Sequence, residues 1–295
     1  MAELEATAAV AAFSDGLAAA VERAGKSIVL VDARRRFPAT GIAWQPGGII
    51  VTSDHVLERE DDIGIVLPSG DRVAATLVGR EPGSDLAVLR IEGDLTPAEQ
   101  APAAKVGQVV LAVGRPEPSL MASFGVVSAV GGPWQTATGV QVDGFIRSDT
   151  TFYPGFSGGP LVDALGRVLG LNSSRLGRGS GLTIPANSVD RVVQALAQHG
   201  RVRRGYLGIT TQPVTAAAAS GLLVVGVEAG SPADQGGLLV GDIITGVGEA
   251  AVDSSTDLRR HLGPDAIGKA VTVRVTRGGE ARALAVTIGE RPQSR

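Results

Sequence analysis

Ser157 lies in the segment Gly-Phe-Ser-Gly-Gly, whose glycines suit a serine that acts as a nucleophile. Small neighbours let a substrate carbonyl approach the hydroxyl closely, and they let the backbone point N–H groups at a developing oxyanion. The N–H groups of Gly155 and Ser157 are the candidates for such an oxyanion hole. In a chain with 41 glycines the same string also fits an ordinary turn, so the chemistry depends on a base and an acid elsewhere in the sequence.

The chain contains three histidines, and each is a candidate for the general base. His55 follows the apolar run 49–52, and strand ends and loops are where catalytic groups tend to lie. His199 ends an expected helix, where a cation suits the helix dipole. His261 lies on another expected helix, where a solvated or packing role is favoured. His55 is therefore the favoured base for Ser157.

Asp85 is the favoured acid because it comes directly before an apolar run, 86–91, which would bury its carboxylate and let it hold the imidazole tautomer. Asp54 competes with it. Adjacent residues of a strand point to opposite faces, however, which makes Asp54 a poor partner for His55. Asp149 is closer to the serine in sequence, and a solvated or structural role is favoured for it. The three chosen residues follow in the order His, Asp, Ser.

The Gly-x-Ser-x-Gly string also matches the nucleophile elbow of α/β-hydrolases, which requires a helix after the serine and the order Ser, acid, His. Here Pro160 and the strand-like Leu161 and Val162 follow the serine. Only His199 and His261 lie late enough in the chain to serve such an enzyme. An esterase of the α/β-hydrolase class stays as an alternative, while the residue order favours the chymotrypsin-like arrangement.

Short β-rich runs separated by turn signals must position these residues. The runs lie at 27–31, 48–52, 63–67, 72–78, 86–91, 109–113, 124–130, 140–148, 161–162 and 167–172. Segments between them, such as 68–71 and 163–166, have the composition of turns. Many short strands at regular spacing favour an antiparallel barrel or sandwich over a parallel α/β sheet.

The pattern changes after Pro185, where apolar residues recur at helical spacing up to Gly200. This helix and the basic segment that follows it indicate a boundary between two domains, 1–200 and 201–295. The second domain is expected to contain strands at 222–227, 242–247, 270–276 and 283–288 and a helix at 254–262. Gly278 and Gly279 between the last two strands predict a hairpin.

Bulk composition excludes several classes of protein. The formal charge of the 295 residues is −3 with acids and bases mixed, so no nucleic-acid partner is expected. The absence of cysteine excludes a thiol nucleophile, disulfides and thiolate metal sites, and we expect no metal or cofactor. The acidic, alanine-rich start is a poor secretory signal, and no run of about 18 apolar residues suits a membrane span. These features predict a cytoplasmic location.

Taken together, the residues resemble the HtrA (DegP-like) family, in which a chymotrypsin-like serine protease precedes one PDZ domain. The matching segments are the histidine segment 49–56, the aspartate segment 84–89, the serine segment 149–162, a strand at 182–185 and a junction at 202–209. The resemblance implies a mostly β fold, with a double β-barrel protease domain followed by a PDZ domain. It also implies a serine endopeptidase that cleaves unfolded or damaged proteins, in protein quality control or the stress response.

The resemblance carries further expectations about partners and place. It implies unfolded polypeptide substrates, binding of peptide C-termini at the PDZ domain, a cell-envelope or periplasmic location, and a homotrimer built through N-terminal aromatic residues. For such a trimer the chain offers Phe13 and Phe37. The alternative function is a non-catalytic, protease-like scaffold or chaperone that binds unfolded chains.

In the chymotrypsin fold the floor of the specificity pocket lies about six residues before the serine, which here is Thr151. A residue without a carboxylate argues against a preference for Arg or Lys and favours small or aliphatic side chains. Leu171, Ile184 and Phe156 are the candidate pocket walls. Tyr153 and Phe156, both in the oxyanion loop, stand where the family usually has Asn, so this loop departs from the family pattern. The loops 114–122 and 173–181 are short compared with those of the family, where such loops carry activation signals, so the resemblance implies simpler regulation.

The candidate carboxylate-binding loop of the PDZ domain consists of Tyr206, Leu207, Gly208 and Ile209. Its backbone N–H groups would capture a C-terminal carboxylate, and the next strand edge would pair with the peptide. An ordinary buried strand with a glycine bulge is the alternative interpretation. Arg259, Arg260 and His261 lie on the helix expected to flank this groove, where they would tune specificity.

Overall fold

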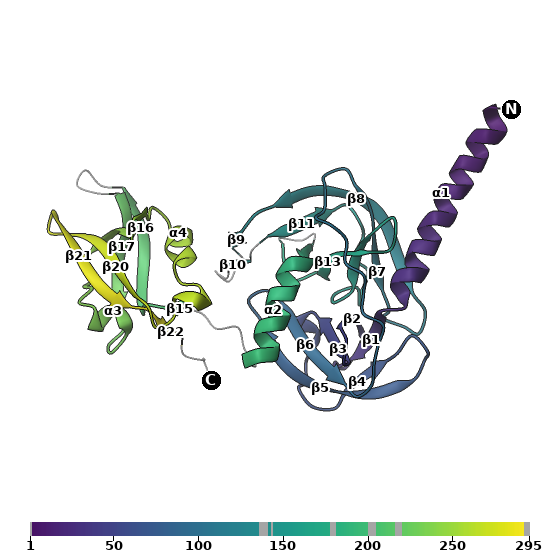
Figure 1. Ribbon diagram of the computed structural model, residues 1–295, viewed down its shortest axis with the longest axis horizontal. Helices are drawn as coiled ribbons and strands as arrows, with labels where there is room; N and C mark the ends of the chain where they lie inside the picture. Colours follow the sequence, from purple (N-terminus) through teal and green to yellow (C-terminus); the bar gives the residue numbers. More distant parts are fainter. Residues whose placement is uncertain are drawn as a thin grey trace. The chain divides into compact units, whose positions relative to one another are not determined.

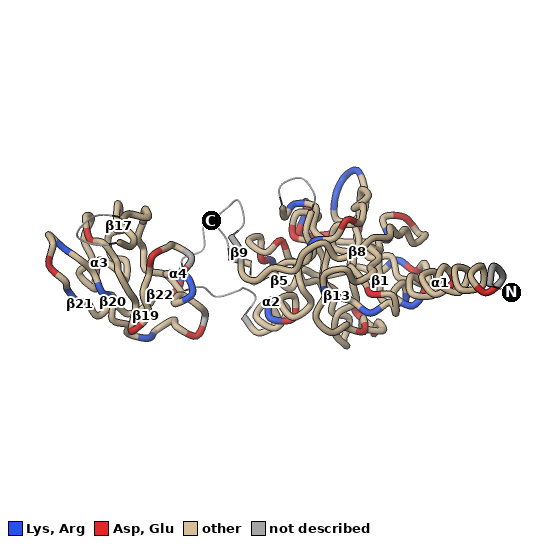
Figure 2. The backbone as a smooth tube through the Cα atoms, turned by 90° about the horizontal axis from the view of Figure 1, so that it is seen from above, with Lys and Arg blue, Asp and Glu red and all other residues tan. Residues whose placement is uncertain are grey.

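The computed structural model describes residues 2–135, 141–142, 144–177, 181–199, 205–215 and 220–291. The chain divides into two compact units, Met1–Arg201 and Val202–Arg295 (Figure 1). Charged residues of both signs are interspersed along both units (Figure 2). Among the helices of the described residues, none is long and apolar enough to cross a membrane.

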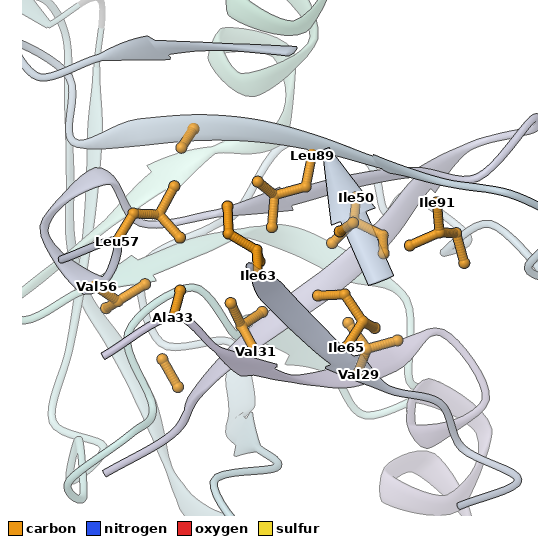
Figure 3. Close-up of a cluster of buried hydrophobic side chains, with 13 residues drawn as sticks. Val29, Val31, Ala33, Ile50, Val56, Leu57, Ile63, Ile65, Leu89 and Ile91 are labelled. Carbon is orange, nitrogen blue, oxygen red and sulfur yellow. The ribbon is translucent and has the colours of Figure 1, made fainter. Parts of the chain in front are cut away.

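A closed six-stranded antiparallel barrel forms the first half of unit 1. Its strands are β1 (Ile28–Asp32), β2 (Ala39–Gln45), β3 (Ile49–Thr52), β4 (Ile63–Val66), β5 (Arg72–Glu81) and β6 (Leu86–Ile91), in the order β1-β2-β3-β6-β5-β4. Branched aliphatic side chains such as Val29, Ile50 and Leu89 fill its interior (Figure 3). These β-branched and apolar runs favour strands because they pack on both pleated faces. The barrel brings the end of β3 beside the start of β6.

A second closed barrel follows, in the order β11-β14-β13-β12-β7-β8. Its strands are β7 (Val109–Gly114), β8 (Met121–Gly131), β11 (Phe145–Ser148), β12 (Pro160–Asp163), β13 (Val168–Ser173) and β14 (Leu182–Pro185). The short pair β9 (Trp134–Gln135) and β10 (Gln141–Val142) lies outside the barrel. The expected single strand 140–148 is therefore interrupted, and residues 140 and 143 lie outside the described residues.

Two helices pack on the barrels. The helix α1 (Ala2–Gly25) was not predicted, because its alanine-rich sequence was considered only as a targeting segment. Alanine has the highest helix propensity, and the last turns bury Ala20 and Ala24 against unit 1. The helix α2 (Ala186–His199) was predicted, and Asp190 on it accepts a 2.7 Å hydrogen bond from the indole N–H of Trp44.

Unit 2 contains a sheet in the order β16-β17-β18-β20-β21, with β19 paired to β18, and a separate two-stranded sheet of β15 and β22. Its strands are β15 (Gly205–Tyr206), β16 (Ile209–Thr215), β17 (Ser220–Val227), β18 (Ile243–Val247), β19 (Ala250–Ala251), β20 (Ala270–Arg277), β21 (Glu280–Thr287) and β22 (Gly289–Glu290). The helices are α3 (Pro232–Gln235) and α4 (Ser255–Arg260), with a short 3-10 turn, η2, at Pro264–Ala266. Gly278 and Gly279 have φ of +59° and +88° in the β20–β21 hairpin, which is the predicted turn.

Candidate active site

His55 and Asp85 form a close pair where β3 ends and β6 begins in the first barrel. His55 lies in the 3-10 turn η1 (Asp54–Val56) after β3, and Asp85 directly precedes β6. The Nδ1 atom of His55 lies 2.9 Å and 2.8 Å from the two carboxylate oxygens of Asp85. The carboxylate therefore selects the tautomer that carries its proton on Nδ1, which leaves Nε2 free to accept a proton.

The Asp85 carboxylate is fully buried and has three donors. Besides the imidazole, the backbone N–H of His55 donates at 3.0 Å and the hydroxyl of Ser173 donates to the second oxygen. The backbone of Asp85 has φ of +56°, a region that Asp tolerates better than most residues, and its carbonyl accepts from the N–H of Asp54 at 3.1 Å. Ser173 was missed from the sequence, since a strand-end serine carries no signal of its own.

The two rejected acids have other partners. Asp54 accepts a 2.6 Å hydrogen bond from the guanidinium of Arg80, so it lies in an ion pair and does not contact the His55 ring. Asp149 accepts from the backbone N–H of Val126 at 2.6 Å, which fixes β8 locally. Asp85 is thus the acid that contacts the His55 ring, while these two carboxylates bond elsewhere.

Ser157 lies in a loop that glycines hold in a tight conformation. Gly155 and Gly158 have φ of +86° and +87°, and a Cβ on Gly158 would lie 2.0 Å from the carbonyl oxygen of Thr40. The hydroxyl of Thr40 donates to the carbonyl of Gly155 at 2.7 Å. Among the described residues, neither the Gly155 N–H nor the Ser157 N–H has a hydrogen-bond acceptor. Both donors are therefore free for an incoming oxyanion.

The Ser157 hydroxyl contacts another serine. Its oxygen lies 2.8 Å from the hydroxyl oxygen of Ser174 and accepts from the Ser174 N–H at 3.2 Å. Within the described part of the chain, no hydrogen bond joins Ser157 to His55. The nucleophile candidate and the base candidate thus face the same space without being bonded.

One cavity of about 370 Å³ contacts the base, the serine and the oxyanion loop. It is lined by Arg34, Arg36, Phe37, His55, Glu58, Phe152, Tyr153, Pro154, Gly155, Ser157 and Ser174. The Arg34 guanidinium donates to the carbonyls of Phe37 and Pro38, and burial lowers its pKa. Within the described residues, Arg36 has no ion pair or hydrogen bond. The cavity therefore has aromatic walls and charges of both signs, with the cations Arg34 and Arg36 and the carboxylate of Glu58.

The predicted pocket residues do not line this cavity. Phe156, Leu171 and Ile184 are fully buried in unit 1, and Thr151 is exposed with its carbonyl accepting from Ser123. Phe156 is part of the second barrel's core and meets Tyr153 edge-on at 5.3 Å. Burial of a Phe side chain stabilises a fold by about 1.5–3 kcal/mol, which favours the core over the cavity. The walls beside Ser157 are instead Phe152, Tyr153 and Ser174.

In unit 2 the candidate carboxylate loop lies between β15 and β16. Gly208 has φ of +79°, and a Cβ there would lie 2.2 Å from the Cβ of Ser231. Among the described residues, the N–H groups of Leu207 and Gly208 have no acceptor. The hydroxyl of Tyr206 donates to Glu228, which raises the pKa of Tyr206. Two free donors thus lie at the start of β16.

An edge strand and a helix follow that loop. The strand β16 lies at the edge of the sheet, and α4 packs on it. Arg260 and Asp257, both on α4, form an ion pair with 2.7 Å between the guanidinium nitrogen and the carboxylate oxygen. His261 is the C-cap residue of this helix. An edge strand beside a helix can accept an extended peptide as an additional strand.

Two family models match the chain, one in each unit. The model described as a trypsin-like peptidase domain matches residues 39–171, and the PDZ domain model matches residues 205–288. The solved HtrA-type protease AlgW with a tripeptide is 30% identical, with a TM-score of 0.80 over 94% of this chain and 98% of that chain. This chain belongs to the HtrA family. The predicted fold class, a chymotrypsin-like double barrel followed by a PDZ domain, is confirmed.

Other proteases are similar over most of this chain, and the share of their own length that is covered varies. The crystal structure of the serine endoprotease from Yersinia pestis is 30% identical, with a TM-score of 0.80 over 94% of this chain and 98% of that chain. A probable periplasmic serine endoprotease DegP-like of Halomonas elongata is 34% identical over 88% of this chain and 58% of its own length. Protease Do-like 1, chloroplastic, of Arabidopsis thaliana is 33% identical over 86% of this chain and 64% of its own length. The chain thus spans little more than half the length of the curated DegP-like relative.

The predicted cytoplasmic location is contradicted by these HtrA relatives. Seven of the curated proteins that the chain matches are named probable periplasmic serine endoproteases, DegP-like. The prediction rested on the composition of the N-terminal segment and on the lack of an apolar run long enough to span a membrane. The structure places the N-terminal segment in the helix α1. Alanine and glutamate favour helix formation, so the composition of this segment is explained by its helical structure and does not indicate a location.

Proposed function

We propose that this HtrA-family protein is a serine endopeptidase that cleaves unfolded or damaged polypeptides. The observation that carries the proposal is that His55, Gly155 and Ser157 line one cavity while Asp85 holds the His55 ring from behind. The similar proteins from Halomonas and Yersinia are named serine endoproteases, which supports the same activity here. We place the boundary between the protease and PDZ domains at residues 200 and 201.

In the proposed mechanism Ser157 Oγ attacks a peptide carbonyl while Nε2 of His55 takes the hydroxyl proton. Asp85 keeps the ring oriented and stabilises the imidazolium that forms. The free N–H groups of Gly155 and Ser157 donate to the oxyanion of the tetrahedral intermediate. His55 then gives its proton to the leaving amine, and a water repeats the cycle to release the acyl group. No metal or cofactor enters these steps.

The walls of the cavity suggest which side chains it accepts. Phe37, Phe152 and Tyr153 offer aromatic surface, and Arg36 offers a positive charge without a partner among the described residues. The two cations Arg34 and Arg36 outnumber the one carboxylate, Glu58, in the cavity lining. A cationic substrate side chain would therefore be repelled on balance, so Arg and Lys are disfavoured next to the scissile bond. Small and aliphatic side chains are the proposed preference, in agreement with the sequence.

The PDZ domain is proposed to capture peptide C-termini. Its loop 206–209 provides two free N–H donors for a carboxylate, and β16 provides an edge for pairing. The solved AlgW structures carry a decapeptide or a tripeptide, which supports peptide binding by this family member as well. Arg259, Arg260 and His261 lie at the end of α4 and are proposed to tune the choice of peptide.

Two features of assembly and location remain proposals. Phe13 on α1 is half-exposed and meets Phe124 edge-on at 6.3 Å, so the two rings form an aromatic patch suited to a homotrimer contact. The mass in solution tests this, with Phe13→Ala expected to dissociate the trimer.

The names of the DegP-like relatives support a location in the cell envelope.

Labelling with a fluorophosphonate tests the function against a non-catalytic scaffold that only binds unfolded chains. The probe reacts with an activated serine and leaves an inert hydroxyl unmodified. We expect one adduct, mapped by mass spectrometry to Ser157, and no adduct in Ser157→Ala. An unlabelled wild-type protein that still binds casein would establish the scaffold function instead.

A further inference from the structure

Two consecutive serines contact opposite ends of the candidate triad. Ser173 ends β13, is fully buried, and donates to the Asp85 carboxylate. Ser174 follows it, is exposed to the cavity, and contacts the Ser157 hydroxyl. Adjacent side chains of an extended segment point to opposite sides, which explains how two neighbours reach both groups. One backbone segment therefore fixes the acid and the nucleophile together.

The contact with Ser174 leaves Ser157 without its catalytic partner. Ser174 provides two polar groups to the Ser157 oxygen, a hydroxyl at 2.8 Å and a backbone N–H at 3.2 Å. If Ser157 donates to Ser174, its proton is directed away from His55. If Ser174 donates instead, its hydroxyl and N–H occupy both lone pairs with which Ser157 would attack a carbonyl. Either direction of this hydrogen bond opposes the reaction.

We propose that Ser174 is a positioning residue that holds the Ser157 hydroxyl in a resting hydrogen bond, which must break before His55 can take the proton. This inference rests on the proposed role of Ser157 as nucleophile. Ser174 lines the cavity, so a peptide that fills the cavity competes for its polar groups. Release of Ser157 is thereby coupled to the arrival of substrate.

The test compares variants of the full-length protein that differ only in the hydroxyl. Thr and Val have nearly the same shape. Ser174→Thr therefore keeps the hydroxyl contact with Ser157 and Ser174→Val removes it, while the backbone N–H contact is present in both variants. The second-order rate of fluorophosphonate labelling of Ser157 is the readout, because this small probe does not need the peptide-binding groups. We expect Ser174→Val to react about two- to tenfold faster than Ser174→Thr, the effect of one hydrogen bond of ordinary strength.

Ser173→Ala is the matched control on the neighbouring residue. It removes a donor to Asp85 and is expected to slow labelling, which is the opposite direction. Thermal unfolding of each variant verifies that the fold is kept. Equal rates for the Thr and Val variants, or a slower Val variant, overturn the proposal. A wild-type protein that does not label at all refutes the proposed function instead, so the two failures are distinguishable.

Discussion

The carboxylate of Asp85 accepts hydrogen bonds from both the ring Nδ1 and the backbone N–H of His55. The acid thereby fixes the ring and the 3-10 turn that carries it. Since the carboxylate is buried and a third donor comes from Ser173, its orientation is set by the two barrels jointly. The geometry of the candidate site therefore depends on where β3 and β13 end and where β6 begins.

Asp85→Asn should preserve the shape of this site and reduce kcat for a peptide substrate about 10⁴-fold. The amide presents an N–H group to Nδ1, which stabilises the wrong tautomer of His55. Asp54→Asn is the control, because Asp54 pairs with Arg80 and does not touch the ring. The control should lower thermal stability while kcat stays near the wild-type value. Comparable losses of kcat in both variants would contradict the assignment of Asp85.

Gly208→Ala should weaken binding of a C-terminal peptide to the PDZ domain. A Cβ at Gly208 would meet Ser231 at 2.2 Å, and the positive φ of this residue disfavours any side chain. The loop must then shift its N–H groups away from the carboxylate. Gly263→Ala is the control, because a Cβ there meets nothing within 4 Å. Fluorescence anisotropy of a labelled peptide measures both affinities, and equal values would argue against this loop.

Arg36→Glu should change the charge preference of the cavity. We expect the ratio of kcat/KM for a Lys-containing over a Leu-containing peptide to rise about two- to fivefold, the range of an exposed ion pair. Arg35→Glu serves as the control, since Arg35 lies beside Arg36 in sequence and does not line the cavity. The assay is done at low ionic strength, because salt screens exposed charges. An identical ratio in both variants would exclude Arg36 from substrate selection.

The PDZ domain should lose stability in acid through Asp242. Burial raises the pKa of this carboxyl, but the ion pair with Arg277 and the N–H of Leu239 outweigh burial, so the pKa is lowered overall. A lowered folded-state pKa means that the ionised form stabilises the fold above the unfolded pKa of about 3.9. That stabilisation is lost as the pH falls through the folded-state pKa.

Asp242→Asn separates this effect from general acid unfolding. The free energy of unfolding of unit 2 should be lower in the variant at neutral pH, and the two proteins should converge as the pH falls below about 4. Chemical denaturation at several pH values measures both curves. Parallel curves over the whole range would show that Asp242 does not contribute to the acid sensitivity.

Much of the site could be predicted because it depends on local features. The expected strand 86–91 has the same bounds as β6, and Asp85 and His55 lie at the strand ends that the sequence indicated. The contacts of Ser173 and Ser174 could not be predicted, because they join residues far apart in the chain. Phe156 was expected at the cavity, and the direction of its side chain was decided by the core of the second barrel.

Cleavage of an unfolded protein tests the central claim most directly. Purified wild-type protein and Ser157→Ala are incubated with casein, and the products are followed by electrophoresis and mass spectrometry. We predict that the wild type produces internal peptides from casein and that the variant, with an unchanged unfolding temperature, produces none. Equal cleavage by the variant, or an intact casein with the wild type, would contradict the account.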